Sequence, residues 1–152
     1  MKIIVYKSRR LLVCESDGST ILTAPVQLGF GASDGPKLRE GDGRTPEGEY
    51  FISAKNPESK FHLSLGISYP GPRDAEKALA SGVISAADYE RICLSPRRPP
   101  WDTPMGGYIM IHGQKSPSAS GDWTAGCIAV ENSVMDALFP IVSIGDSVHI
   151  LP

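Results

Sequence analysis

Long apolar runs are absent from this sequence of 152 residues. No stretch approaches the roughly eighteen apolar residues that a membrane-spanning helix needs, so we expect no membrane span. The opening segment, MKIIVYKSRR, has only four apolar residues between Lys2 and Lys7, which is too short for the apolar region of a signal peptide. We therefore expect that the protein stays in the cytosol, has lost a leader, or leaves the cell by another route.

An excess of charge of one sign is also missing, because the formal net charge is −2. Short basic clusters occur at 7–10 (KSRR) and at 95–100 (SPRRPP). Neither cluster is long enough to indicate a surface for nucleic acid. We expect no nucleic-acid partner, and we expect a monomer.

Cysteine and histidine are scarce, with three residues of each type. No pair of cysteines has C-x-x-C spacing, and the histidines lack the spacing typical of metal ligands. The sequence therefore predicts neither a disulfide framework nor a metal site, and no cofactor is expected. Cys14 lies in an apolar, strand-like run and Cys93 on an expected helix, so we interpret both as structural residues.

Glycine and proline, in contrast, are plentiful, with 16 and 13 residues. Together with short β-branched runs they favour a mainly β (α+β) fold with many turns, as one domain over residues 1–152. Strands are expected at 2–7, 10–16, 21–30, 49–55, 60–69, 107–113, 127–130 and 146–151. A helical excursion is expected around 70–105, with helices at 74–80 and at 85–93, where Ser85 is the N-cap. A third helix is expected at 132–142, capped by Asn132.

The segment GDWTAGCIAV (121–130) places Cys127 behind Gly126, and the run IMIHG ends at His112 and Gly113. A thiol attacks carbonyl groups as the thiolate, so a catalytic cysteine needs a base such as imidazole. Two antiparallel strands joined by the loop 114–126 would bring these two side chains together. Gly126 would let a substrate approach, and the amide of Cys127 would face a developing oxyanion.

The alternative interpretation is that Cys127 is a small buried hydrophobic residue and His112 a hydrogen-bonded core histidine. Spacing alone does not decide between the two interpretations.

Three segments, taken in order, resemble one known family. Residues 107–130, GYIMIHGQKSPSASGDWTAGCIAV, resemble the active-site signature of the L,D-transpeptidase (YkuD-type) catalytic domain. Residues 41–52, GDGRTPEGEYFI, resemble its Thr-Pro-x-Gly-x-aromatic motif, and residues 132–151 resemble its closing helix and strand. The resemblance implies a β-sandwich of mixed sheets with a few short helices.

The resemblance also implies a thiol acyl-transfer mechanism in the cell envelope. Cys127 would attack the carbonyl of an L-centre in a peptidoglycan stem peptide and release the following D-residue. His112 would be the base, oriented by the carbonyl of Gly113. The thioester would then pass to an amine, as in a transpeptidase, or to water, as in a carboxypeptidase or amidase.

One departure from the family signature concerns Ala125 and Ala129, which stand where the family usually has a second histidine and often an arginine. The form GCIAV-x-N, with LSLGISYPGPRDAEKALASG upstream, resembles a divergent branch that includes an amidase removing a lipoprotein from peptidoglycan. The departure concerns the acceptor and the substrate, and leaves the nucleophile unchanged.

Further candidates each have a functional and a structural interpretation. Thr124 could hydrogen-bond beside the nucleophile or close the loop, and Trp123 could cover the site or anchor the loop to the core. Arg44 could bind a stem-peptide carboxylate through its planar guanidinium or remain a solvated loop charge. Tyr69 is a candidate substrate contact. Both Tyr69 and Tyr108 could face either the cleft or the core.

Two other functions remain open at this point. One is a thiol peptidase or amidase that acts on a substrate other than peptidoglycan. The other is a catalytically inactive module that binds peptide or glycan. The presence of both His112 and Cys127 argues against an inactive module, because binding needs neither residue.

Overall fold

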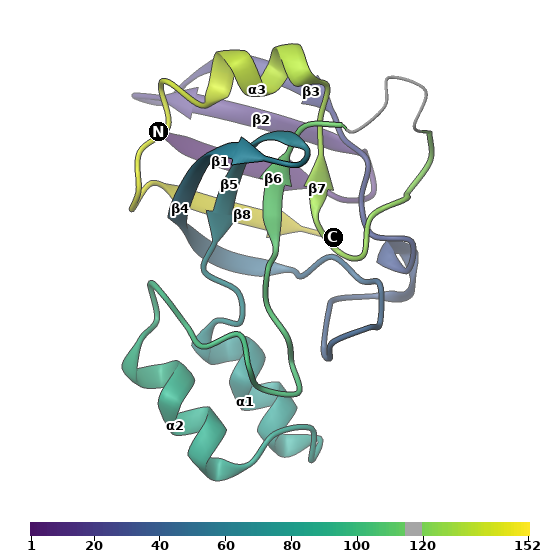
Figure 1. The fold of residues 1–152 in the computed structure, drawn as a ribbon, viewed down its shortest axis with the longest axis vertical. Helices are drawn as coiled ribbons and strands as arrows, with labels where there is room; N and C mark the ends of the chain where they lie inside the picture. Colours follow the sequence, from purple (N-terminus) through teal and green to yellow (C-terminus); the bar gives the residue numbers. More distant parts are fainter. Residues whose placement is uncertain (115–119) are drawn as a thin grey trace.

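The fold is seen in a computed structural model that describes residues 1–114 and 120–152. Within these residues the strands form a mixed eight-stranded sheet in the order β3-β2-β1-β8-β4-β5-β6-β7, so the mainly β prediction is confirmed (Figure 1). The strands are β1 (Lys2–Tyr6), β2 (Leu11–Ser16), β3 (Ser19–Pro25), β4 (Gly48–Ser59), β5 (His62–Ile67), β6 (Met110–His112), β7 (Ile128–Ala129) and β8 (Ser147–Leu151). The helices are α1 (Pro72–Ala80), α2 (Ala86–Leu94) and α3 (Asn132–Leu138), with a 3-10 turn, η1, at Ala32–Asp34.

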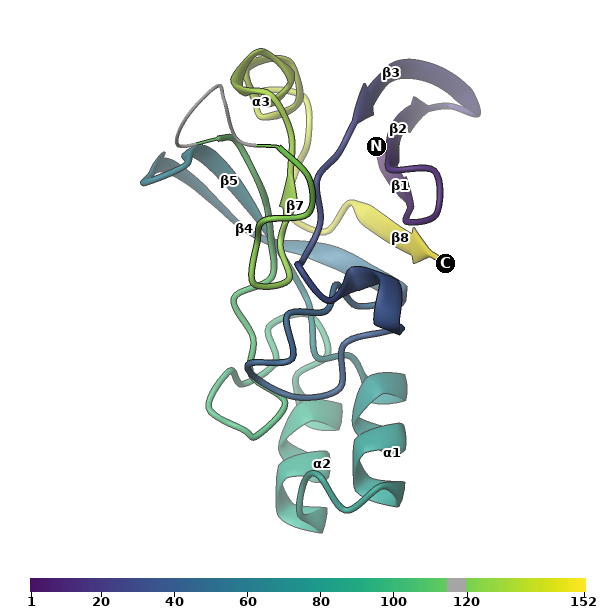
Figure 2. The same ribbon diagram turned by 90° about the vertical axis from the view of Figure 1, so that its right-hand side faces the viewer.

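The sheet curls through β4, which belongs to both halves. The first residues of β4, Gly48–Phe51, pair with β8, and the rest pair with β5. Figure 2 shows β1–β3 on one side and β5 and β7 on the other, with α3 across one end. The space between the halves is filled by buried aliphatic side chains, among them Ile3, Val5, Leu12, Leu28, Ile52, Leu65, Ile67, Ile111, Ile128 and Val148.

Local sequence explains the N-terminal strands. Strand β2 (LLVCES) buries every second residue, Leu12 and Cys14, because successive side chains of a strand point to opposite faces. The turn into β3 is Asp17-Gly18, whose φ angles of 50° and 78° suit the tight turn of a β-hairpin.

The helical excursion lies where it was expected, between β5 and β6. Figure 1 shows α1 and α2 packed together at one end of the molecule, beyond the sheet. The predicted N-cap of α2 is confirmed, because Oγ of Ser85 accepts a hydrogen bond of 3.1 Å from the amide of Asp88. No helix among the described residues is both long and apolar enough to cross a membrane.

The expected strand at 21–30 is divided in two. Strand β3 ends at Pro25, and the chain beyond it crosses to the other half of the sheet, where Gln27 bridges to Ala129 and Gly29 to Thr124. Proline has no amide proton for a sheet ladder, so the change of partner at this point has a local cause. These bridges pair the segment that follows β3 with β7 and with the turn before β7, and they close the curl.

Two further expectations are corrected. Strands β6 and β7 are parallel, with Ile111 opposite Ile128, whereas an antiparallel hairpin was expected. The connection of fifteen residues, 113–127, is long enough for the crossover that parallel neighbours need. The N-cap of α3 is Glu131, and the side chain of Asn132 instead accepts a hydrogen bond from the amide of Gln114.

Candidate active site

The parallel pairing of β6 with β7 places His112 and Cys127 on one face of the sheet. Ile111 is opposite Ile128, and His112 is opposite Ala129, so Cys127 lies just before β7, beside Met110. Alternate residues of a strand share a face. His112 and Cys127 therefore point away from the side on which Ile111 and Ile128 are buried.

The Cys127 sulfur is half-buried and hydrogen-bonded to the neighbouring strand. Its Sγ donates to the carbonyl of Tyr108 at 3.2 Å and accepts from the amide of Met110 at 3.4 Å. Burial raises the pKa of the Cys127 thiol, while the Met110 amide and the positive charges of Lys37 and Lys60 act in the opposite direction. The resting group is a thiol, so it needs a base to become a nucleophile.

His112 is buried, with 3% of its surface exposed. Its Nδ1 lies 2.6 Å from the carbonyl oxygen of Gly113. Because a carbonyl can only accept, Nδ1 carries the proton, and Nε2 of the neutral ring carries the lone pair. Burial lowers the pKa of His112, partly offset by the Gly113 carbonyl, so the ring is a neutral base near pH 7.

Two aromatic rings hold the imidazole of His112. Phe61 stacks on it with ring centroids 4.4 Å apart. Trp123 packs edge to face with it, with ring centroids 5.8 Å apart. The indole Nε1 of Trp123 donates to Oε1 of Gln27 at 2.7 Å. The sequence indicated Trp123 but missed Phe61 and Gln27, because both lie in apolar strand patterns with no local sign of a site.

Thr124 uses its hydroxyl to close the turn that carries Cys127. Its Oγ1 donates to the carbonyl of Cys127 at 2.7 Å and accepts from the amide of Gly126 at 3.1 Å. The geometry favours the interpretation of Thr124 as a residue that closes the loop.

Both site glycines are required by close contacts with neighbouring segments. Gly126 has a φ of 142°, and a Cβ there would lie 2.8 Å from the carbonyl oxygen of Arg44. A Cβ on Gly113 would lie 2.3 Å from the side-chain Oδ1 of Asn132 and 2.7 Å from the carbonyl oxygen of Phe61. The chain therefore has no room for a side chain at either position.

The loop that contains Arg44 packs against the turn from Thr124 to Cys127. Arg44 is half-buried; its amide donates to Oδ1 of Asp42 at 3.0 Å, and its carbonyl faces Gly126. The Thr-Pro segment and the cysteine segment, far apart in the sequence, thus meet at one place.

Tyr69 and Tyr108 have opposite environments. Tyr69 is fully buried, and its hydroxyl donates to the carbonyl of Met105 at 3.3 Å, which favours its interpretation as a core residue. Tyr108 is 66% exposed, and its carbonyl accepts from the thiol of Cys127.

The two departures from the family signature have different surroundings. Ala125 is exposed, whereas Ala129 is fully buried in β7 opposite Gln27. A larger residue fits at Ala125 but would displace core atoms at Ala129.

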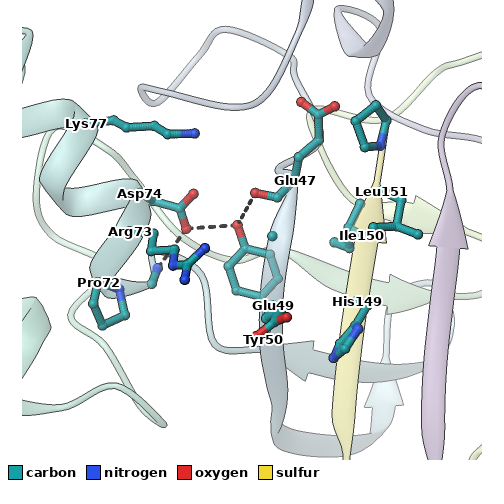
Figure 3. Close-up of a pocket in the computed structure, with 13 residues that line it drawn as sticks. Glu47, Glu49, Tyr50, Pro72, Arg73, Asp74, Lys77, His149, Ile150 and Leu151 are labelled. Carbon is teal, nitrogen blue, oxygen red and sulfur yellow. Dashed lines mark hydrogen bonds between the residues drawn. The ribbon is translucent and has the colours of Figure 1, made fainter.

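A hollow of about 570 Å³ lies elsewhere, between α1, β4 and β8 (Figure 3). Asp74 Oδ2 accepts from the Tyr50 hydroxyl at 2.8 Å and from the Gly71 amide at 2.9 Å. Burial raises the pKa of Asp74 to about 6. This lining holds charged groups but neither His112 nor Cys127. Among the described residues no cluster of His, Cys, Asp and Glu could hold a metal ion.

Comparisons with known proteins agree on one family. The sequence model of the L,D-transpeptidase catalytic domain (YkuD) matches residues 1–150. YafK of Escherichia coli (strain K12) is 28% identical over 111 residues, which are 72% of this chain and 32% of YafK, so the chain spans about a third of that relative.

Solved structures share the fold. The helical cell shape determining protein Pgp2 of Campylobacter jejuni is similar with a TM-score of 0.67 and 21% identity, over 98% of this chain and 46% of that one. L,D-transpeptidase 1 of Mycobacterium tuberculosis is similar with a TM-score of 0.56 and 13% identity, over 99% of this chain and 60% of that one.

Proposed function

Because the chain belongs to the L,D-transpeptidase catalytic domain family, we propose that it is a cysteine acyl-transfer enzyme that acts on peptidoglycan stem peptides. The observation that carries the mechanism is the hydrogen bond of 2.6 Å from Nδ1 of His112 to the carbonyl of Gly113. That bond directs the basic Nε2 away from Gly113, on the face of the sheet that His112 shares with Cys127. A neutral base and a thiol on one face are the two groups that acyl transfer needs.

The first half of the reaction forms a thioester. Nε2 of His112 takes the thiol proton, and the sulfur of Cys127 attacks the carbonyl carbon of the L-centre. The carbon–sulfur bond forms, and the oxyanion is stabilised by the amide of Cys127. The carbon–nitrogen bond then breaks, and the imidazolium returns its proton to the departing amine of the D-residue.

The second half regenerates the thiol. An amine or water gives a proton to His112 and attacks the thioester carbonyl, and the carbon–sulfur bond breaks. The Cys127 thiolate then recovers the proton from the imidazolium. With an amine the product is a cross-link, and with water it is a shortened stem peptide.

The residues around the pair have positioning roles in this proposal. Phe61 and Trp123 keep the imidazole of His112 in place and keep water from it. Thr124 fixes the turn that aims Cys127. Arg44 reaches the nucleophile turn through its backbone, and its guanidinium is the candidate group for a stem-peptide carboxylate.

The test is to incubate purified peptidoglycan with the protein and to identify the muropeptides by mass spectrometry. We expect cross-linked or shortened stem peptides with the wild type and none with Cys127→Ala. Cys93→Ala, which removes a half-buried thiol on α2, is the matched control and keeps the activity.

Two outcomes would contradict the proposal. Muropeptides that change equally with Cys127→Ala would exclude a thioester at Cys127. Muropeptides that the wild type leaves unchanged would favour a peptidase for another substrate if a peptide thioester forms on Cys127, and an inactive binding module if none forms.

A further inference from the structure

Arg10, in the turn between β1 and β2, binds the segment that leads to Cys127. Its Nε donates to Oδ1 of Asp122 at 3.1 Å, and its Nη2 donates to Oδ2 of the same carboxylate at 2.6 Å. Two parallel bonds between a guanidinium and a carboxylate make a strong and directional ion pair. The mechanism proposed above uses neither of these two residues.

Both members of this ion pair are partly shielded from solvent. The side chains of Arg10 and Asp122 are 33% and 23% exposed. Oδ1 of Asp122 also accepts from the amide of Leu28 at 3.0 Å. Burial alone would raise the pKa of Asp122, but the bonds from Arg10 and Leu28 and the charge of Lys7 hold it below its ordinary value. The pair is therefore ionised near neutral pH, and its bidentate geometry distinguishes it from an ordinary surface ion pair.

Arg10 connects two segments that meet beside Cys127. Its carbonyl oxygen accepts from the amide of Val26 at 2.9 Å, where the chain beyond β3 begins to cross toward β7. Its guanidinium holds Asp122, at the start of the segment 122–127. The φ of Arg10 is 48°, a conformation that favours glycine, so the contacts of this side chain offset a local backbone cost.

The segment after Asp122 reaches the imidazole within one residue. Trp123 follows Asp122 directly and packs edge to face with His112. A change in the position of Asp122 would therefore change how well Trp123 shields the imidazole from water.

The same segment reaches the thiol through Thr124. The amide of Thr124 donates to the carbonyl of Leu28 at 3.2 Å, and its carbonyl accepts from the amide of Phe30 at 2.9 Å. Its hydroxyl donates to the carbonyl of Cys127. The backbone that Asp122 anchors is thus the backbone that carries Cys127.

We propose that Arg10 is a positioning residue, which acts through Asp122 to keep Trp123 against His112 and to hold Cys127 in line with the reacting carbonyl. The inference rests on the proposed function and adds a support for its two reacting groups. Misplacement of a reacting group by about 1 Å can slow catalysis by two orders of magnitude. Loss of the ion pair should therefore lower kcat and leave KM nearly unchanged.

The first test is steady-state kinetics with a soluble stem-peptide substrate. We expect kcat to fall about tenfold to a hundredfold in Arg10→Ala. Asp122→Asn should fall similarly, because its amide oxygen can still accept from Leu28 while its amide nitrogen cannot accept from Arg10. The double variant should be no slower than Arg10→Ala, because the two residues act as one pair. Arg9→Ala is the matched control and keeps kcat, since that exposed guanidinium lies 5.1 Å from the ring centroid of Tyr6.

A pH profile separates positioning from a loss of folded protein. Fewer folded molecules would lower kcat/KM by the same factor at every pH. A displaced Trp123 would instead admit water to His112, so the decline of kcat/KM at low pH should move to higher pH in both Arg10→Ala and Asp122→Asn. Lys60, the charged residue that also lowers the pKa of His112, lies between β4 and β5 and is unchanged in both variants.

Alkylation of Cys127 by iodoacetamide, followed against pH by intact-protein mass spectrometry, tests the same role without a peptidoglycan substrate. Its decline at low pH should also move to higher pH in the two variants and stay in place in Arg9→Ala. If the wild type turns over no stem peptide but the alkylation profile moves, the proposed function is contradicted and the positioning role is supported. Turnover by the wild type with unmoved profiles in the variants, or equal losses in Arg9→Ala, would overturn only the positioning role. If Arg10→Ala does not fold, Asp122→Asn decides by the same measurements.

Discussion

In the proposed mechanism, His112 sets the pH range in which the thiol of Cys127 can be activated. The base works only when it is neutral, and burial lowers its pKa below the ordinary value of 6.5. As pH falls, kcat/KM should therefore decline only below 6.5, as His112 takes up a proton. The measurement is a profile of kcat/KM against pH with a soluble stem-peptide substrate.

Phe61→Ala tests whether burial of His112 is the cause of this pH dependence. Phe61→Ala removes the ring that stacks on the imidazole and admits water. The acidic decline should then move to higher pH, toward the ordinary value for histidine. A wild-type decline at or above the ordinary value, unchanged in Phe61→Ala, would show that burial does not tune this base.

Cys127 should react with alkylating reagents faster than the other thiols near neutral pH. Cys14 is buried and Cys93 lies on α2, whereas Cys127 has a base on the same face of the sheet. Limiting iodoacetamide followed by intact-protein mass spectrometry measures the reaction, with Cys127→Ala as the reference. Labelling mainly of Cys14 or Cys93 would contradict the assignment of the nucleophile.

His112→Ala should slow turnover by about two to four orders of magnitude, the contribution typical of a general base. The circular dichroism spectrum should remain that of the wild type. Phe61 and Trp123, the two rings that pack on His112, also pack on each other with ring centroids 5.6 Å apart, so their contact does not depend on the imidazole. An unfolded variant would instead support a core histidine.

At the scale of the element, the turn from Thr124 to Cys127 depends on one hydroxyl. Thr124→Val keeps the shape of the side chain but leaves the Gly126 amide and the Cys127 carbonyl without their partner. We expect a loss of about 1–3 kcal/mol in the free energy of unfolding and a lower kcat. Urea unfolding and steady-state kinetics measure the two effects.

Thr124→Ser is the matched control, since it keeps the hydroxyl and loses only a methyl group. It should retain most of the stability and the activity. Equal losses in both variants would show that the methyl group, and not the hydroxyl, holds the turn.

The elements whose determinants are local could be predicted from the sequence. The β1–β2 hairpin and helix α2 with its cap at Ser85 lie where patterning and capping place them. The direction of β7 beside β6 could not be predicted, because strand patterning does not record which neighbour a strand pairs with. The same reason applies to the break after Pro25, where the partner changes.

The same distinction holds in the candidate site. Contacts between neighbours in the sequence could be predicted, and contacts between distant segments could not. His112 and Gly113 are adjacent in the sequence, so the bond between them belongs to a motif that can be read along the chain. Phe61 and Gln27 come from distant strands, and only the folded chain brings them to the imidazole and to Trp123. Tyr69 and Tyr108 both lie among apolar residues, and the sequence could not show that only the second is exposed.

At the scale of the whole molecule, Asp74 should make stability depend on pH. Its pKa is raised from 3.8 to about 6, so the fold favours the neutral carboxyl. The free energy of unfolding contributed by this group is greatest below about pH 4 and falls as pH rises to about 6, by about 3 kcal/mol. Denaturant unfolding across this range measures the loss.

Asp74→Asn isolates this effect from the other carboxyl groups. The amide oxygen can accept the bonds from Tyr50 and Gly71, and no charge is buried. The variant should equal the wild type near pH 4 and exceed it at neutral pH. Glu49→Gln, an exposed residue of the same hollow, should change neither value, and a difference that does not grow with pH would contradict the prediction.

The position of β8 has a consequence for synthesis on the ribosome. This strand lies between β1 and β4, so residues 147–151 connect strands that are made much earlier. Cys127 therefore leaves the ribosome before the scaffold that positions it is continuous. Because non-local strand pairing is slow, the nascent chain carries its thiol for a time without the surroundings that activate it. In the proposed mechanism, acyl transfer therefore begins only after β8 has completed the middle of the sheet.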